Sequence, residues 1–364
     1  MASVRPRLRV GILGVMNPLA RELIRSLSHH PFFCLGSLVE FGGSESLAVL
    51  YANHLSLLDP LDKNVRSQRV QRIEKIRVVQ EECDLVFSTL ETKSAALWEP
   101  AYAKHGLPVL SASNNFRREP DIPVVCPEIN PHHLDILSLQ QKKRGYASGF
   151  VCALASQMVR AALLPVFPLY RDFGLTEASF TAMIGMQSQP PVFGMDIVNN
   201  LIPLSLSVGN DYALEFLRIF GQPTRDGISP ASDIQINLSL WQVPIQNGIV
   251  LDHHLSLSNN TTRVEVEECW SEFSGQPQVL QLPMAPNPVL LQNRFPDRPQ
   301  PALDLNTIGD LAVYIGQTRM PQAQTLRLSS LISGSSESRA SELLLLASLM
   351  LARGWLPEAE DVRL

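Results

Sequence analysis

The residues of this chain best able to do chemistry are two carboxamides and a carboxyl group, on Gln157, Gln242 and Glu215. Gln157 follows Ser156 at the predicted start of a long helix, where backbone N–H groups and the helix dipole favour an anionic oxygen. A carboxamide can polarise a carbonyl or enolate oxygen, but it cannot take up a proton at neutral pH. Proton transfer then falls to Glu215, to one of His253 and His254 or to the substrate itself, and burial of Glu215 would raise its pKa towards that of a general acid.

Other polar and aromatic residues lie close to these three in the sequence. His253 and His254 occupy one predicted strand, so only one of them can face a cleft; we take His253 as the substrate-facing member, and a structural or surface role remains open for both. Trp241 either lines an apolar pocket or belongs to the core. Ser156 is typical of a helix N-cap, whose hydroxyl accepts a backbone N–H, and it could also contact substrate.

A second candidate site is the turn Gly11-Ile-Leu-Gly14-Val-Met-Asn17, which joins a short apolar run to a helical pattern. Glycines in such a turn let the pyrophosphate of a dinucleotide approach the helix N-terminus. Asn17 and Pro18 stand where a third glycine is usual, yet both suit a turn that enters a helix. Glu40, after the next apolar run, fits a ribose hydroxyl and favours NAD if a dinucleotide binds.

The composition is that of an ordinary globular protein. The 364 residues suffice for two domains, and 45% hydrophobic with 18% charged residues is a usual balance. The net charge of -5 argues against nucleic acid as a partner. Five cysteines without a C-x-x-C pair suit a reducing cytoplasm, and we expect neither disulfides nor a metal site. No stretch is apolar enough for a membrane span, so we expect a cytoplasmic protein.

The first part of the chain predicts an α/β fold with a parallel sheet. Short apolar runs typical of buried strands lie at residues 8–13, 33–39, 85–89 and 108–111. Helical patterns lie at 17–27 and 93–105. Strands that alternate with helices are typical of a Rossmann-like sheet covered on both faces, and we assign residues 1–149 to this domain.

The pattern changes at Phe150. A helical pattern covers residues 156–173, and strand-like runs follow at 234–244, 250–257 and 262–268. They predict an α+β domain with an antiparallel sheet over residues 150–329.

Several segments resemble aspartate-semialdehyde dehydrogenases of the fungal and archaeal type. Gly149-Phe-Val-Cys-Ala-Leu-Ala-Ser-Gln157 resembles the strand and helix start that carry the family's catalytic cysteine. Further matches are Cys83-Asp-Leu-Val-Phe-Ser, Ser111-Ala-Ser-Asn-Asn-Phe-Arg-Arg, Cys126-Pro-Glu-Ile-Asn-Pro-His-His-Leu-Asp-Ile and Met195-Asp-Ile-Val-Asn-Asn-Leu-Ile-Pro. The resemblance implies that a C-terminal helix within 330–364 completes the first domain, that the second domain mediates dimerisation, and that the protein is a homodimer or homotetramer.

The positions that carry the family's chemistry hold other residues here. In the register of the resemblance, Gln157 replaces the catalytic cysteine, Gln242 a substrate-binding arginine and Ile249 the acid/base histidine. Without a thiolate no acyl-enzyme can form, so we expect no phosphate-dependent oxidation of aspartate semialdehyde. The resemblance also implies substrate contacts for Arg117 and Asn115, and for Gln187 in the family's flexible loop; the plain alternatives are a salt bridge for Arg117 and an exposed helix face for Glu215.

The cofactor site also departs from the family pattern. The distal, nicotinamide part of the site aligns with Glu337-Ser-Arg-Ala-Ser341 and Leu346, where the family has small residues and an asparagine. We therefore expect no cofactor, with Gly11, Gly14 and Asn17 as a vestige of the fold, and NAD(P) binding as the alternative.

Three classes of function remain open. The first, which we favour, is a cofactor-independent catalyst of cyclisation, isomerisation, elimination or addition on a small molecule, in specialised metabolism. The second is an NAD(P)H-dependent reductase that uses no cysteine, since reducing a free carbonyl or imine needs no thioester. The third is a non-catalytic partner or regulator of an active paralogue.

Overall fold

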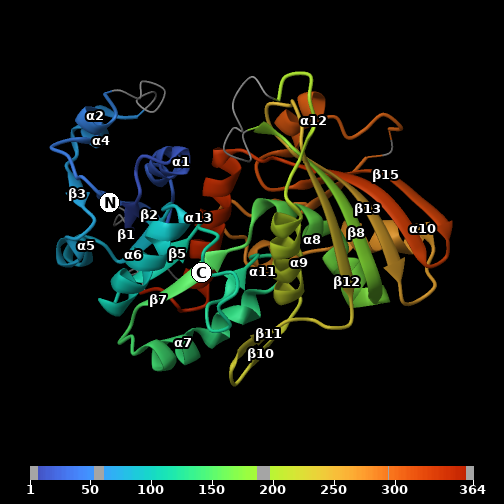
Figure 1. Cartoon of the computed structure of the whole chain (residues 1–364), viewed down its shortest axis with the longest axis horizontal. Coiled ribbons are helices and arrows are strands. Elements are labelled where there is room, and N and C mark those ends of the chain that lie inside the picture. The colour runs from blue at the N-terminus through green and yellow to red at the C-terminus, as the bar shows by residue number, and fades with distance from the viewer. Residues whose placement is uncertain (1–6, 53–60, 187–196, 294, 358–364) are drawn as a thin grey trace, which may run out of the picture.

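The chain forms two large β-sheets that lie side by side, each with its own helices (Figure 1). The computed structural model describes residues 7–52, 61–186, 197–293 and 295–357. The last helix lies between the two sheets and is seen in red near the middle of Figure 1. The predicted α/β architecture with a second, α+β unit is confirmed.

The first sheet is wholly parallel, in the order β3-β2-β1-β4-β5-β7-β6. Its strands are β1 (Leu8–Leu13), β2 (Phe33–Glu40), β3 (Val70–Arg72), β4 (Leu85–Ser88), β5 (Pro108–Ser111), β6 (Val124–Val125) and β7 (Phe150–Leu154). Every residue of β4, β5 and β7 is buried, as expected when helices cover both faces of a parallel sheet. This confirms the predicted Rossmann-like sheet.

Short helices surround the first sheet, and the last helix of the chain joins them. The surrounding elements are α1 (Pro18–Leu27), α2 (Leu47–Leu50), α4 (Lys63–Ser67), α5 (Ile76–Glu82), α6 (Thr92–Lys104), the 3-10 helix η1 (Pro131–Ile136) and α7 (Leu137–Arg144). Helix α13 (Ser336–Ala352) packs against α1. Leu343, Leu346 and Met350 of α13 share one apolar core with Ile12 and Phe87, so this helix completes the first core.

The second sheet is mixed, in the order β14-β15-β16-β13-β8-β12-β9. Its strands are β8 (Leu175–Ile184), β9 (Ile202–Pro203), β12 (Gln235–Gln242), β13 (Ile249–Leu257), β14 (Leu290–Gln292), β15 (Val313–Gln322) and β16 (Thr325–Ile332). The predicted antiparallel sheet is correct for most neighbours, but β8 pairs with β12, and β14 with β15, in parallel. Its helices are α8 (Gln157–Phe173), α9 (Leu206–Ile219), α10 (Arg263–Glu272), α11 (Gln276–Val279) and α12 (Pro301–Ile308), and a separate hairpin joins β10 (Gln222–Thr224) to β11 (Gly227–Ser229).

One predicted strand is a helix. Residues 262–268 carry alternating apolar side chains, but Thr262 and Glu265 form a capping box that starts α10. The Thr262 hydroxyl accepts from the Glu265 backbone, and the Glu265 carboxylate accepts from the Thr262 backbone at 2.7 Å. Two helix-end donors are thus satisfied, which outweighs the strand-like alternation.

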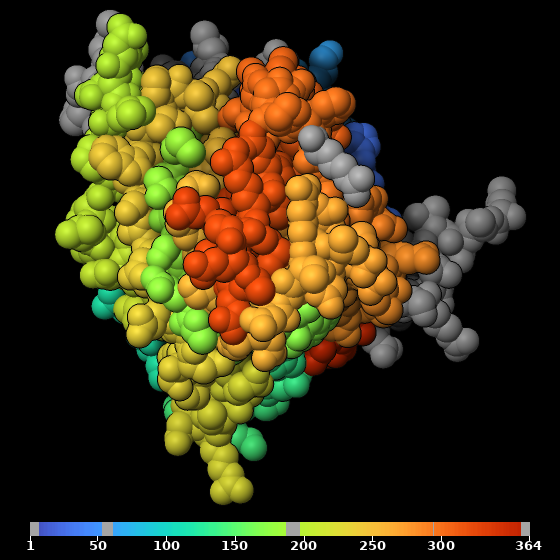
Figure 2. All heavy atoms as spheres, turned by 90° about the vertical axis from the view of Figure 1, so that its right-hand side faces the viewer, coloured from blue at the N-terminus to red at the C-terminus, as the bar shows by residue number. Residues whose placement is uncertain are grey.

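The outer surface of the second sheet forms a broad face of the molecule. Figure 2 shows this face, with gold, green and red-orange parts of the second sheet in adjacent bands. Exposed side chains here include Asn237, Ser239, Trp241, Asp252 and His254. Among the described residues, no helix is long and apolar enough to cross a membrane.

Candidate functional site

A cavity of about 200 Å³ lies where the first sheet meets the second. Ala112 follows β5 and Ser156 follows β7, so the cavity opens at the carboxyl edge of the parallel sheet, where ligands of such folds bind. Ile184 and Ile249 border it from the second sheet. The other lining residues are Asn114, Arg117, Gln157, Met158, Tyr212 and Arg339.

Ser156, Glu215 and Arg117 form a chain of contacts beside the cavity. The Ser156 backbone N–H donates to Glu215 Oε1 at 2.6 Å, and the Ser156 hydroxyl donates to the same oxygen at 3.0 Å. Glu215 Oε2 lies 3.1 Å from Arg117 Nε. Ser156 occupies the N-cap position of α8 as predicted, but the predicted capping hydrogen bond is absent, because the carboxylate on α9 takes its hydroxyl.

Glu215 supports the cavity without reaching it. Its side chain is buried, both oxygens are engaged, and it is absent from the lining. The prediction that Glu215 is the acid or base of the site is corrected: it positions Ser156 and Arg117, which do line the cavity.

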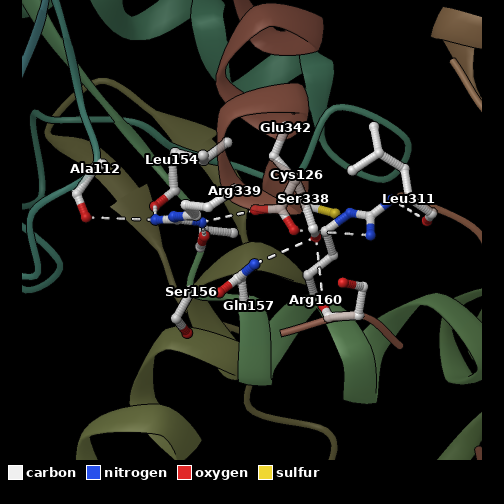
Figure 3. Close-up of polar contacts among 12 residues, drawn as sticks. Ala112, Cys126, Leu154, Ser156, Gln157, Arg160, Leu311, Ser338, Arg339 and Glu342 are labelled. Atoms are coloured by element: carbon white, nitrogen blue, oxygen red, sulfur yellow. Dashed lines mark hydrogen bonds and ion pairs between the residues drawn. The ribbon is translucent and has the colours of Figure 1, made fainter. Parts of the chain in front are cut away.

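Gln157 is the first residue of α8, and its side chain is turned towards α13 (Figure 3). Its Nε2 donates to the Ser335 carbonyl at 3.2 Å and to Ser338 Oγ at 3.3 Å. The donor that the sequence predicted for a substrate oxygen instead holds two helices together. Gln157 still lines the cavity, and its carboxamide oxygen can only accept a hydrogen bond.

Arg339 supplies a second guanidinium group that the sequence interpretation missed. From α13 it donates to the carbonyls of Ala112, Leu154 and Ala155 at the ends of β5 and β7, and it pairs with Glu342 at 2.8 Å (Figure 3). Burial lowers the pKa of this guanidinium. The available signal was a pair of opposite charges three residues apart at the start of a helix that is mostly apolar beyond it.

A buried ion network lies behind Gln157. Arg160 of α8 donates to Glu128 at 2.6 Å and to the Leu311 carbonyl at 2.8 Å, and it lies 3.8 Å from Glu342 (Figure 3). Burial lowers the pKa of Arg160, but the negative charges of Glu128 and Glu342 raise it by more. The pKa of this guanidinium therefore lies above its ordinary value. Since Glu342 also pairs with Arg339, which lines the cavity, the network joins α8 to α13.

None of the five cysteines lines the cavity. Burial raises the pKa of every thiol, to about 12 at Cys269 and well above its ordinary value at Cys126. A nucleophilic thiol needs the opposite environment, an electropositive and accessible one that lowers its pKa. The chain therefore places no reactive thiolate in this cavity.

Three residues predicted for the cleft lie elsewhere. Gln242 ends β12 between Ile184 and Ile202 and is buried, outside the lining; its Oε1 has no partner in the described part of the chain. Trp241 points to the opposite, outer face, where it is 37% exposed. His253 is fully buried, 2.8 Å from Ser330 Oγ, and burial lowers its pKa to about 3. The prediction of a cleft position is thus wrong for each of them, because the alternation of a strand sends Gln242 and His253 into the core.

Of the other residues predicted to contact substrate, one lines the cavity, one does not, and one lies outside the described residues. Arg117 lines the cavity as predicted. Asn115 does not, because its neighbour Asn114 lines the cavity instead and accepts a hydrogen bond from Arg117. Gln187 lies outside the described residues.

The turn after β1 has the geometry of a dinucleotide turn. Gly14 has a φ of +86°, and a side chain there would lie 3.2 Å from Thr89 Oγ1 and 3.1 Å from Leu90. Asn17 caps α1 by accepting from the Leu19 N–H at 3.0 Å, and its Nδ2 donates to the Thr89 carbonyl. Glu40, at the end of β2, accepts from the Met16 N–H at 3.1 Å. The turn is preformed, with one carboxylate beside it.

Gly11 has a different role from the one predicted. It lies within β1, and a Cβ there would come within 3.0 Å of Cys83 Sγ and Val86. Its small size serves the packing of the sheet, so Gly14 and Asn17 are the members of the motif that shape the turn. In the described part of the chain, no three His, Cys, Asp or Glu residues are arranged to hold a metal ion.

Comparison with known proteins identifies relatives over nearly the whole chain. Residues 9–137 match the family model for the semialdehyde dehydrogenase NAD binding domain, and residues 148–332 match the semialdehyde dehydrogenase dimerisation domain. An aspartate-semialdehyde dehydrogenase of Cryptococcus neoformans is 27% identical over 97% of this chain and 99% of its own. A malonyl CoA reductase (NADP) of Metallosphaera sedula is 26% identical with the same coverage.

A solved structure shows the same fold. The crystal structure of aspartate semialdehyde dehydrogenase with NADP from Candida albicans has a TM-score of 0.86 and 25% identity, covering 95% of this chain and 99% of that one. The expectation that no cofactor is used is therefore wrong: the first domain is an NAD-binding domain, and a similar structure contains NADP. The turn forms without the usual third glycine, because Asn17 takes that place and caps α1.

Proposed function

Because this chain belongs to the semialdehyde dehydrogenase family, we propose that it is a nicotinamide-dinucleotide-dependent oxidoreductase that acts on a small anionic carbonyl compound without a cysteine nucleophile. The observation that carries this proposal is the lining of the cavity. Two guanidinium groups and the head of α8 meet at the carboxyl edge of the NAD-binding sheet, and no thiol is among them.

The residues around the turn after β1 fit the dinucleotide. Gly14 keeps the turn free of side-chain atoms, Asn17 fixes the start of α1, and Glu40 offers acceptors to ribose hydroxyls. When bound, the dinucleotide supplies or accepts a hydride. Strand β1 ends at this turn, and β5 and β7 end beside the cavity. All three end at the same carboxyl edge of the sheet, where β4 lies between β1 and β5.

The cavity residues suit a small acid. Arg117 can hold a carboxylate beside the positive charge of Arg339, with the uncapped amides at the head of α8 as further donors. Gln157 Oε1 would accept from a hydroxyl or amino group of the same molecule. Met158, Ile184 and Ile249 form the apolar wall, and about 200 Å³ leaves room only for a small metabolite.

Each polar group then has one task in the proposed reaction. Arg117 orients the substrate and offers its positive charge to the oxygen on which negative charge develops, and Glu215 keeps that guanidinium in place. Gln157 holds α8 against α13 through its amide nitrogen. Since no thiolate is available, no acyl-enzyme forms, and the carbonyl compound reacts while bound by hydrogen bonds and ion pairs alone.

The test follows the absorbance of the reduced nicotinamide with purified protein, NADH or NADPH, and a panel of small oxo acids and aldehyde acids. We expect oxidation of the nicotinamide with at least one acid, no phosphate-dependent oxidation of aspartate semialdehyde, and no adduct by intact-protein mass spectrometry. Gln157→Ala should impair turnover, whereas Gln222→Ala, which removes an exposed glutamine of β10, should not. A covalent adduct at any of the five cysteines would overturn the proposal.

A different result would favour a different class of function. Conversion of a substrate with no change in nicotinamide absorbance would support a non-redox reaction such as cyclisation, isomerisation, elimination or addition. No conversion together with co-purification of an active paralogue would support a non-catalytic partner.

We also propose that the protein is a cytoplasmic homodimer or homotetramer that assembles through the outer face of the second sheet. The dimerisation-domain match covers this sheet, and Trp241 is an exposed aromatic residue on that face. Trp241→Lys should shift the mass measured by light scattering towards the monomer, whereas Phe295→Lys, at another exposed aromatic residue, should leave it unchanged.

A further inference from the structure

The carboxyl end of β2 carries one acidic side chain, Glu40, fixed beside the turn after β1. Its Oε2 accepts from the Met16 N–H at 3.1 Å, and its Oε1 accepts from the Phe41 N–H at 3.0 Å. Each carboxylate oxygen keeps a further lone pair, so the group can accept from a ligand while these contacts persist. The contact with Met16 ties the negative charge directly to the turn.

We infer that Glu40 makes this protein selective for NAD(H) over NADP(H). The inference rests on the dinucleotide-dependent function proposed above and specifies which dinucleotide serves it. In sheets of this topology an acidic residue at the end of β2 accepts from the adenosine ribose hydroxyls. A 2′-phosphate has no such donor to offer and brings like charge against the carboxylate. The NADP of the similar Candida albicans structure is therefore not the dinucleotide expected here.

The cations near Glu40 do not reverse this preference. Arg72, opposite Glu40 on β3, is the nearest candidate for a 2′-phosphate, but its side chain is 63% exposed and lies 3.7 Å from Glu74. Arg21 of α1 is paired with Glu22 at 2.7 Å. An exposed cation of this kind is screened by solvent, whereas Glu40 is held by two backbone donors at the turn itself.

The residue after Glu40 adds a feature common to both dinucleotides. Phe41 is 42% exposed although its side chain is wholly apolar. An exposed aromatic ring beside the ribose-binding carboxylate suits the adenine base, which stacks on such rings. A variant at Phe41 should therefore weaken adenosine binding in general, whereas a variant at Glu40 should change the preference at the 2′ position.

Calorimetric titration of the full-length protein with NADH and with NADPH tests the inference without requiring a substrate. We expect NADH to bind at least about tenfold more tightly than NADPH at low salt, because the two negative charges of the 2′-phosphate of NADPH approach the Glu40 carboxylate. Glu40→Gln should tighten NADPH binding at least about fivefold and weaken NADH binding. Glu45→Gln, which removes an equal charge from the same exposed loop, should leave the ratio unchanged, and Phe41→Ala should weaken both dinucleotides alike.

Three outcomes would overturn the inference. Equal or tighter binding of NADPH by the unaltered protein would show that Glu40 does not discriminate, while dinucleotide dependence itself would stand. An unchanged ratio in Glu40→Gln would show that residues other than Glu40 discriminate between the two dinucleotides. Binding of neither dinucleotide would overturn both this inference and the proposed function.

Discussion

Two strand-to-helix turns at the carboxyl edge of the first sheet differ in how they use the head of their helix. At the β1–α1 turn, Asn17 caps the helix and Glu40 accepts a loop amide, so the turn carries its own negative charge. At the β7–α8 turn, Ser156 gives its hydroxyl to Glu215, no side chain caps the helix, and two guanidinium groups line the adjoining cavity. The first turn thus suits hydroxyl groups, and the second suits an anion.

The difference shows that similar local folds can select opposite ligand charges through a few side chains. Both turns follow a buried parallel strand, and both present a helix N-terminus to the same edge. Because the dipole of a helix end is worth at most about 2 kcal/mol, one carboxylate or one arginine nearby decides which charge is accepted. Variants at these positions test whether the two turns act independently.

The largest effect is expected at Arg117. Arg117→Ala removes the partner of the buried Glu215 carboxylate, and we expect it to lower the free energy of unfolding by about 3 kcal/mol. It should also raise the KM for the small acid on the order of 100-fold, with dinucleotide affinity unchanged. The double variant Arg117→Met, Glu215→Met should recover stability but not substrate binding. Recovery of both would remove Arg117 from the site.

Glu99 lies between the two turns and links stability to pH. Burial raises its pKa to about 7, although Ser88 and Ser111 oppose the shift. The folded-state pKa is above the unfolded value of about 4.5, so its stabilising contribution is fully present below pH 4.5 and is lost as the pH rises to about 7. Glu99→Gln should therefore be more stable than the unaltered protein at pH 8, by up to about 3 kcal/mol. Chemical denaturation at pH 4.5 and pH 8 measures this difference, and equal differences at both values would contradict it.

The two helix starts can be compared directly with two alanine variants. Asn17→Ala removes the α1 cap and should cost about 1 kcal/mol, together with several-fold weaker dinucleotide binding. Ser156→Ala should not weaken the start of α8, because no side chain caps that helix. It should weaken only the binding of the small acid, through the contacts of Ser156 with Glu215 and of Glu215 with Arg117. If Ser156→Ala weakened dinucleotide binding as much as Asn17→Ala, the two turns would be coupled.

The smallest effect is expected from salt. Raising the ionic strength from about 0.05 M to 0.5 M should weaken binding of the small acid several-fold, because screening reduces the attraction of Arg117 and Arg339. Binding of NADH should change less, since Glu40 acts on neutral hydroxyl groups. Titrations at both salt concentrations, with the same protein sample, provide the comparison.

The sequence predicted the frame better than the site. Apolar runs located β1, β4 and β5 because strands buried on both faces tolerate little else. Residues 262–268 form a helix and not the predicted strand, because the capping box of Thr262 and Glu265 outweighs the alternation of apolar side chains. Within the site, sequence position identified Arg117 and Gln157, but it could not show which way a side chain turns.

The errors at the site share a physical cause. Gln242 and His253 lie on strands, where successive side chains point to opposite faces of the sheet. An error of one residue in the predicted register therefore places a core side chain in the cavity. Ser156 donates to a carboxylate of α9, 59 residues further along the chain. Arg339, which lines the cavity, belongs to α13. Such partners come from tertiary packing, which local pattern does not encode.

The position of α13 has a consequence for how the protein is made. Leu343, Leu346 and Met350 fill the core beneath β1 and β4, although about 330 residues separate Leu343 from β1 and about 255 separate it from β4. During synthesis the NAD-binding domain therefore emerges from the ribosome before the second sheet but lacks one wall of its core until α13 has been made. A nascent chain that ends before α13 would leave the apolar surface of this core exposed.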